Sequence, residues 1–299
     1  MILLDGKKLS QKILDELKQE AAGMAKKLRL AVVVVGKNPV VEKFIGQKRK
    51  AALSIGVDFR VYPFEETITT DELRKHLQKI VREKKNTGVV IQLPLPGHVS
   101  VQYILNSVIP EKDVDMLSVR SVGALAVGPK SSAMVGPSAA VGGLGRKNII
   151  LPPVAGAIKA FFDEYSIEYK NKNIVVVGAG KLVGLPVSLW LLGEKTPFGV
   201  VTNQTPDISE FTKNADIIIS GAGRPKLITG DMVKKGVIIV DAGTSESEGR
   251  ISGDADFESV SQKASYITPV PGGIGPVTIA MVFKNLVLLS KSKSHRRRV

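Results

Sequence analysis

A glycine-rich turn in the second half of the chain has the residue types and spacing that suit a phosphate group. Gly178, Ala179 and Gly180 follow the apolar run 173–177 and precede a helical pattern. Glycines let the backbone approach a pyrophosphate closely, and the amino end of a helix offers free N–H donors and a positive dipole. The third glycine, Gly184, comes one residue later than the GxGxxG spacing requires, so a tight turn without a ligand is the alternative.

Two more glycine clusters, at 221–225 and 241–244, also end predicted strands. Ligands of open parallel sheets bind at the carboxyl ends of the strands. Three such ends together favour a nucleotide-binding sheet.

The segment 268–276 combines three prolines with three glycines. The prolines fix the chain, while the glycines leave backbone N–H and C=O groups exposed for a flat ligand. Pro276 can open the helix that follows. A structural turn is the alternative, but a rigid loop with so few side chains contributes little packing of its own, so we favour a ligand-facing loop.

The elements that must position these loops alternate between strand and helix. Runs of β-branched residues closed by Gly, Pro or Asn indicate strands, and apolar residues at helical spacing indicate helices. The sequence predicts strands at 30–35, 58–62, 88–92, 173–177, 199–202, 215–220, 237–241 and 265–268, and helices at 1–20, 41–55, 70–84, 157–165 and 277–289. This alternation predicts βαβ units and parallel sheets.

We therefore expect a two-domain α/β fold. The first domain, over residues 1–127, is completed by a returning C-terminal helix at 277–291, and a Rossmann-like, doubly wound parallel sheet occupies 149–276. Small residues dominate between the two, so 128–148 is predicted to be an inserted linker or surface loop. Residues 292–299 are predicted to be a basic, flexible tail.

Composition excludes several kinds of site. The chain has no cysteine, which rules out disulfides, thiolate metal sites and cysteine nucleophiles. Its three histidines are scattered, so no metal is expected. The net charge of +14 would attract anions such as nucleotides, polyglutamate tails or nucleic acid. The amphipathic start lacks a secretory signal and no continuous apolar run is long enough to span a membrane, so we expect a soluble, cytoplasmic protein.

The chain resembles the bifunctional methylenetetrahydrofolate dehydrogenase/methenyltetrahydrofolate cyclohydrolase family. The matching segments occur in the family's order over nearly the full length. They are Lys48-Arg-Lys-Ala51, Val90-Ile-Gln-Leu-Pro-Leu-Pro96, Pro110-Glu-Lys-Asp-Val-Asp115, Val183-Gly-x-Pro186, Ala215-Asp-Ile217, Gly253-Asp-Ala-Asp-Phe257 and Pro269-Val-Pro-Gly-Gly-Ile-Gly-Pro276, the last with Thr278, Ala280, Met281 and Asn285.

The resemblance implies a folate cleft between the domains, with Lys48, Gln92 and Asp115 as catalytic residues. Lys48 would transfer protons, because a partly buried lysine close to Arg49 and Lys50 can have a lowered pKa. Gln92 would hold the amine, and Asp115 would accept hydrogen bonds from the N–H groups of the pterin. Taken alone, each of these three residues would fit an ordinary structural role, as a solvated lysine, a strand-end amide or a turn aspartate. Because all three match the family's order, we favour the functional roles.

Further contacts are implied by the same resemblance. The substrate would be bound by Phe44, Ile91, Leu93, Pro271, Gly272, Gly273, Ile274 and Gly275. The dinucleotide, either NAD or NADP, would be bound by Gly178, Ala179, Gly180, Asn203, Gly223 and Thr244. The implied chemistry, which serves one-carbon metabolism and purine biosynthesis, is hydride transfer from 5,10-methylenetetrahydrofolate followed by hydrolysis to 10-formyltetrahydrofolate. A homodimer through the second domain is also implied.

The chain departs from the family pattern at several ligand-facing positions. Phe44 stands where the family has tyrosine, so it can still stack on a ring but lacks a hydroxyl that would orient Lys48. Ala179 stands where the family has arginine, which argues against a strong NADP preference unless Lys181 or Lys195 compensates. The other differences are at 151–156 and 202–205 and at Met116, where the family has glycine.

Three interpretations follow from these features. The first is an active folate enzyme with at least one of the two activities. The second is a catalytically impaired homologue with a folate-binding, regulatory or structural role, for which Phe44 and the changed cofactor motif are the support. The third is a nucleic-acid-associated protein using its basic surface, which is disfavoured because no aromatic-rich or zinc module accompanies the charge.

Overall fold

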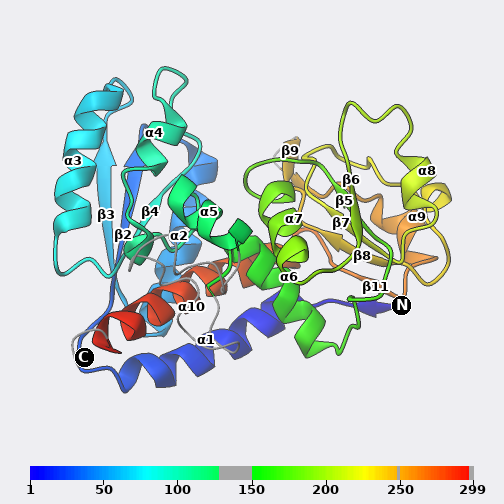
Figure 1. Cartoon of the computed structure of the whole chain (residues 1–299), viewed down its shortest axis with the longest axis horizontal. Helices are drawn as coiled ribbons and strands as arrows, with labels where there is room; N and C mark the ends of the chain where they lie inside the picture. The colour runs from blue at the N-terminus through cyan, green and yellow to red at the C-terminus, as the bar shows by residue number, and fades with distance from the viewer. Residues whose placement is uncertain (128–149, 248–249, 296–299) are drawn as a thin grey trace. The chain divides into compact units, whose positions relative to one another are not determined.

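The computed structural model describes residues 1–127, 150–247 and 250–295 (Figure 1). The chain forms two compact units. The N-terminal unit comprises Lys12–Pro153 and Ile279–Val299, and the C-terminal unit comprises Met1–Gln11 and Val154–Thr278. The predicted inserted loop at 128–148 lies outside the described residues.

A three-stranded parallel sheet, in the order β3-β2-β4, forms the centre of the N-terminal unit. Its strands are β2 (Arg29–Val35), β3 (Asp58–Phe64) and β4 (Gly88–Ile91). Around them lie α2 (Pro39–Ser54), α3 (Thr70–Arg82), α4 (Val101–Leu105), the short 3-10 helix η1 (Pro110–Lys112) and α5 (Val119–Val127). The β-branched run of β2 is buried because this strand is central, with a neighbour on each side.

Helices cover both faces of this sheet. Ala31 and Val33 face a cluster that includes Leu73 and Leu77 of α3, a helix whose amino end is closed by a capping box between Thr69 and Glu72. On the other face, α10 (Ile274–His295) approaches so closely that a Cβ at Gly88 would lie 2.7 Å from Leu286. The C-terminal helix therefore returns to the first sheet, as the sequence predicts.

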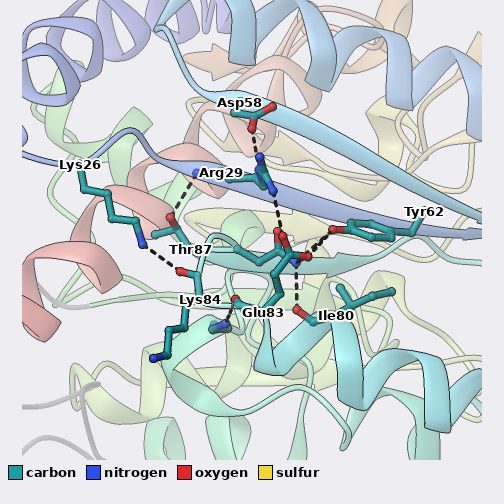
Figure 2. A network of polar contacts seen from close by, with 10 residues as sticks. Lys26, Arg29, Asp58, Tyr62, Ile80, Glu83, Lys84 and Thr87 are labelled. Carbon is teal, nitrogen blue, oxygen red and sulfur yellow. Dashed lines mark hydrogen bonds and ion pairs between the residues drawn. The ribbon is translucent and has the colours of Figure 1, made fainter.

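A polar network connects the first residues of β2 and β3, the residue before β4 and Tyr62 further along β3 (Figure 2). Arg29, the first residue of β2, donates from Nε to Asp58 (2.5 Å) and from Nη1 to Glu83 (3.0 Å). Its backbone N–H donates to Oγ1 of Thr87, just before β4, and the Tyr62 hydroxyl donates to Glu83. These contacts tie the start of β2 to the start of β3 and to the residue before β4.

The C-terminal unit contains a six-stranded parallel sheet, in the order β1-β11-β8-β7-β5-β6. Its strands are β1 (Ile2–Leu3), β5 (Ile174–Val177), β6 (Phe198–Val201), β7 (Ile217–Ser220), β8 (Ile238–Asp241) and β11 (Tyr266–Ile267). Its other elements are α6 (Pro153–Glu164), α7 (Gly184–Gly193), α8 (Ser209–Thr212), η3 (Gly230–Met232), α9 (Phe257–Ser261) and a hairpin of β9 (Ser245–Ser247) and β10 (Arg250–Ser252).

The strand order reverses at β5. The chain goes from β5 outward to β6 and then crosses back to β7 on the other side of β5. In open α/β sheets, a crevice for ligands forms at such a switch point, outside the carboxyl ends of the strands. The glycine loops after β5 and β7 stand on the two sides of this point.

The start of the chain differs from the expectation of a single helix in the first domain. Ile2 and Leu3 form the edge strand β1, because the backbone N–H groups of Ile2 and Leu4 donate to carbonyls of Ser265 and Ile267. The first helix, α1 (Gly6–Ala22), begins only afterwards. The residues before Lys12 consequently group with the C-terminal unit.

Helix α10 also differs from two expectations. Its stretch Ile274–Lys291 is long and apolar enough to cross a membrane by length and composition, with a mean hydropathy of 1.4, although no such stretch was expected. However, 61% of that stretch is buried, and Asn285 within it donates to the carbonyls of Val114 and Leu151, as in the core helix of a globular protein. The helix continues to His295, so 292–295 are helical where a flexible tail was predicted.

Candidate functional site

The predicted catalytic residues come together in the N-terminal unit. Lys48 lies on α2, Gln92 follows β4 directly, and Asp115 follows η1. The Nζ atom of Lys48 donates to Oε1 of Gln92 at 2.9 Å. Gln92 in turn donates from Nε2 to the carbonyl of Leu93 (3.0 Å), which orients the amide so that its oxygen faces the amine.

Burial and charge set the protonation of this group. Burial lowers the pKa of the Lys48 amine, and the negative charge of Asp115 opposes that shift. Burial raises the pKa of Asp115 to about 6, while Lys48 lowers it and Asp113 raises it further. The two groups therefore titrate as a pair, with the amine closer to neutrality than an exposed lysine.

The backbone on both sides of Asp115 is held by buried polar groups. The Asp113 carboxylate accepts from the Ser118 N–H (2.9 Å) and from Oγ of Ser121 (2.7 Å). The carbonyl of Val114 accepts from Nδ2 of Asn285 at 2.8 Å. Sequence reasoning did not single out Asp113 or Ser121. Asp113 lies within a motif segment, whereas nothing in the sequence indicates that Ser121 folds back onto it.

The predicted substrate residues of this unit lie in different surroundings. Phe44 is half-buried one helical turn before Lys48, so the two share a helix face. Leu93 is also half-buried beside Gln92. Ile91, in contrast, is 4% exposed within the core cluster, so its side chain serves packing. Met116, directly after Asp115, has a left-handed backbone with φ of 58°.

The predicted cofactor residues lie at one edge of the six-stranded sheet. Gly178 and its neighbours follow β5, Asn203 follows β6, Gly223 follows β7 and Thr244 follows β8, and these four strands are parallel. Asn203, Gly223 and Thr244 are exposed. A Cβ on Gly180 or Gly223 would meet nothing within 4 Å, so both loops have open space beside them.

The late third glycine has a packing reason. A Cβ at Gly184, the first residue of α7, would lie 1.9 Å from the carbonyl oxygen of Gly178. Gly178 itself has φ of 98°, and a Cβ on it would lie 2.9 Å from the carbonyl oxygen of Gly221. The turn after β5 therefore packs tightly against both its own helix and the loop after β7.

The loop 271–275 lies in the C-terminal unit, where part of it serves packing. A Cβ at Gly6 would lie 1.7 Å from the carbonyl oxygen of Gly273, and the Gly6 N–H donates to the carbonyl of Gly272. Gly273 and Ile274 are buried, whereas Pro271 and Gly275 are exposed. Helix α10 begins at Ile274, two residues before Pro276, the residue predicted to open it. Packing thus accounts for Gly273, while the ligand-facing interpretation stays a prediction for the exposed Pro271 and Gly275.

No group of three or more His, Asp or Glu residues that could hold a metal ion occurs in the part of the chain that the structure describes. The polar groups brought together are an amine with an amide and a carboxylate in one unit, and a row of glycine loops in the other. This is the arrangement of a two-unit α/β protein with a dinucleotide-type sheet.

Comparison with known proteins assigns the family. The catalytic domain of tetrahydrofolate dehydrogenase/cyclohydrolase matches residues 4–115, and the NAD(P)-binding domain of the same family matches residues 152–294. The chain therefore belongs to the tetrahydrofolate dehydrogenase/cyclohydrolase family, and it is an enzyme of that family.

Individual relatives match over the whole length. The bifunctional protein FolD of Nautilia profundicola is 42% identical over 296 residues, which is 98% of each sequence. The structure of the bifunctional FolD methylenetetrahydrofolate dehydrogenase/cyclohydrolase from Campylobacter jejuni superimposes with a TM-score of 0.88 at 39% identity, covering 99% of both chains. The Trypanosoma brucei enzyme, in complex with NADP and an inhibitor, has the same TM-score at 31% identity and 99% coverage of both chains.

Proposed function

We propose that the chain oxidises 5,10-methylenetetrahydrofolate to 5,10-methenyltetrahydrofolate with NAD or NADP and hydrolyses the product to 10-formyltetrahydrofolate. The observation that carries this proposal is the hydrogen bond from Lys48 Nζ to Gln92 Oε1. The negative charge of Asp115 also acts on Lys48, whose pKa it raises against the effect of burial. Family membership supplies the substrate class.

In the hydrolytic step, Lys48 acts on protons. Its lowered pKa favours a neutral amine that accepts a proton from the water attacking the methenyl carbon. The same amine, now charged, returns that proton to the ring nitrogen as the carbon–nitrogen bond breaks, and the remaining hydroxyl proton leaves to solvent as the formyl C=O forms. Gln92 keeps the amine in place through the 2.9 Å hydrogen bond, and Asp115 accepts hydrogen bonds from the N–H groups of the pterin.

For the oxidative step, a bound dinucleotide would supply the acceptor for the hydride of the methylene carbon. The residues of the C-terminal unit fit such a cofactor, because open space lies beside Gly180 and Gly223 and the hydroxyl-bearing Thr244 is exposed at the same sheet edge. Ala179 brings no charge toward a 2′-phosphate, while the NADP complex of the Trypanosoma brucei relative keeps NADP a candidate. We propose NAD or NADP, with the choice decided by assay.

We further propose a homodimer in the cytoplasm, formed through the C-terminal unit. Strand β6 is an end strand of the six-stranded sheet, and its Val200 is 42% exposed. Leu185 and Leu192 of the neighbouring α7 are exposed as well. An exposed apolar edge strand is a template for pairing with another chain. We propose no membrane or nucleic-acid partner, the charge of +14 serving anionic ligands instead.

The impaired homologue is the weaker alternative. Phe44 and Ala179 motivate it, but neither change removes the amine, the amide or the carboxylate of the proposed site. Such a protein would bind folate without turning it over.

The two activities are separable in one set of assays. Purified protein is given 5,10-methylenetetrahydrofolate with NAD or with NADP, and methenyl formation is followed by absorbance. Methenyltetrahydrofolate is then supplied directly, and its hydrolysis is followed. Turnover in both assays is the expected result. Folate binding without turnover in either assay would replace the proposal with the impaired homologue.

A further inference from the structure

Two buried carboxylates lie behind the glycine loops that follow β7 and β8. Asp254 is fully buried and Asp241 is 3% exposed. Buried carboxylates are costly unless their oxygens are hydrogen-bonded. The partners found here are chiefly backbone N–H groups of the loops themselves, so the carboxylates act as internal acceptors for loop backbone.

Asp254 holds the loop after β7. Its Oδ2 atom accepts from Oγ of Ser220 (2.6 Å) and from the N–H of Ala222 (2.7 Å), and its Oδ1 atom accepts from the N–H of Arg224 (2.8 Å). Ala222 and Arg224 flank Gly223, a proposed cofactor residue with φ of 66°. One carboxylate therefore fixes the backbone on both sides of that glycine.

Asp241 holds the next loop in a similar manner. It is the last residue of β8, and its two oxygens accept from the N–H of Gly243 (2.9 Å) and from the N–H of Ala255 (2.8 Å). The first bond shapes the turn that leads to Thr244. The second ties that turn to the segment carrying Asp254.

Each carboxylate also packs on a glycine that is near the other carboxylate in the sequence: Asp254 packs on Gly243, and Asp241 packs on Gly253. A Cβ at Gly243 would lie 2.2 Å from Oδ1 of Asp254, and a Cβ at Gly253 would lie 2.2 Å from Oδ2 of Asp241. Both glycines are thus required by a neighbouring carboxylate, not by contact with a ligand. This exchange locks the two loops and the segment 253–255 into one arrangement.

The surroundings of Asp241 disfavour its ionised form. Burial raises the pKa of Asp241 to about 6, and the nearby charge of Asp254 contributes to that shift. Two like charges enclosed together are unfavourable. In return, the hydrogen bonds of Asp241 and Asp254 hold the two loops at the carboxyl ends of β7 and β8 in fixed positions. Binding sites require such pre-organised supports.

We propose that Asp254 is a positioning residue for the dinucleotide. It does not touch the cofactor but sets the loop around Gly223 in its binding shape through the N–H groups of Ala222 and Arg224. Asp241 supports it from the loop after β8. This role rests on the proposed function, because it requires the C-terminal unit to bind NAD or NADP.

The substitution Asp254→Asn tests the role directly. Asparagine has the same shape as aspartate, but an NH₂ group stands in place of one carboxylate oxygen. Both oxygens of Asp254 accept backbone N–H groups in the unmodified protein, so at least one of these donors loses its partner in the variant. We expect the dinucleotide KM to rise about tenfold or more, the effect of leaving one buried donor unsatisfied. Hydrolysis of supplied methenyltetrahydrofolate should be unchanged, because Lys48 lies in the other unit. The matched control is Asp231→Asn, an exposed carboxylate of the same unit, which should change neither value.

A milder variant covers the case in which Asp254→Asn does not fold, as judged by thermal melting. Ser220→Ala removes one of the three donors to Asp254 and leaves the carboxylate in place. We expect it to raise the dinucleotide KM about threefold, with hydrolysis unchanged.

Each outcome decides between distinct claims. An unchanged dinucleotide KM in a folded Asp254→Asn protein would overturn the positioning role, as would an unchanged KM in Ser220→Ala if only that variant folds. An equal loss of hydrolysis and dinucleotide affinity would reduce Asp254 to a structural residue. If the unmodified protein binds no dinucleotide, the proposed dehydrogenase function fails first, and the positioning role fails with it.

Discussion

At the scale of single residues, the account depends on an amine whose pKa is lowered by burial. Lys48, Gln92 and Asp115 could be predicted from the order of the matched segments. Their hydrogen bond and mutual electrostatic effect could not, because α2, β4 and η1 are brought together only by the sheet. The supporting Asp254 was missed because its partners lie 30 to 34 residues earlier in the chain. The partners of Asp113 are near in sequence, but nothing in the sequence indicates that the chain folds back onto it.

The hydroxyl missing at position 44 gives the first prediction. Phe44→Tyr restores a hydrogen-bonding group one helical turn from Lys48, so hydrolysis should accelerate about threefold or more, consistent with one hydrogen bond of roughly 0.5–1.5 kcal/mol. The control is Phe257→Tyr, an exposed position in the other unit. An unchanged rate in Phe44→Tyr would show that the hydroxyl has no part in this enzyme.

The raised pKa of Asp115, about 6, gives a stability prediction. An unfolded aspartate ionises near its ordinary value of 3.8, whereas the folded one holds its proton to about pH 6. Ionisation therefore costs the folded state stability as the pH rises between these values, and the cost persists above about pH 6. Asp115→Asn should therefore raise the free energy of unfolding at about pH 7.5 by about 1 kcal/mol, which corresponds to a rise in Tm of a few degrees.

The same variant should lose that advantage near pH 4, where the carboxyl of the unmodified protein is protonated in the folded state. Thermal melting at both pH values measures the difference. A lower Tm for Asp115→Asn at both values would mean that the carboxylate stabilises the fold and that its pKa is not raised.

At the scale of elements, the site depends on how the carboxyl ends of strands are supported. Most strands and long helices followed from periodicity, because buried parallel strands are continuous β-branched runs. The two-residue strand β1 was missed, since its partner β11 lies more than 260 residues away and the pattern is too short to read. The late start expected for α10 arose from reading Pro276 as the first helical position, although the helix begins at Ile274.

A buried lysine links two elements next to the proposed site. Nζ of Lys112, in η1, donates to the carbonyls of Val81 and Glu83 at the end of α3. Burial lowers the pKa of Lys112, and the charge of Lys26 adds to that effect. Lys112→Met should lower the free energy of unfolding by about 2 kcal/mol, because the buried carbonyl of Val81 and the partly buried carbonyl of Glu83 lose their donor.

Denaturant unfolding measures this loss, and hydrolysis should fall as well, because η1 leads into Asp115. Lys79→Met, at an exposed position on α3, is the matched control and should change little. Equal stability of the two variants would mean that Lys112 does not hold η1 to α3.

At the scale of the whole molecule, the chain consists of two compact units, each built on a parallel sheet. The sequence predicted the α/β class and the two sheets, but not that the first residues join the second sheet. The exposed edge of β6 bears on assembly. Val200→Glu places a charge on that edge and should convert a dimer into monomers, because an edge charge opposes strand pairing.

Analytical ultracentrifugation distinguishes the two states. The control is Val119→Glu, an equally apolar exposed position in the N-terminal unit, which should remain dimeric. A monomeric unmodified protein, or a Val200→Glu variant that stays dimeric, would remove β6 from the proposed interface.

The most direct test of the central claim is the hydrolysis of supplied methenyltetrahydrofolate by Lys48→Ala, with Lys50→Ala as the control from the exposed face of the same helix. We predict that Lys48→Ala slows hydrolysis by about 100-fold or more, the usual contribution of a proton-transferring group, while Lys50→Ala keeps the parent rate. Hydrolysis by Lys48→Ala at the parent rate would contradict the assignment of Lys48 as the proton-transferring residue.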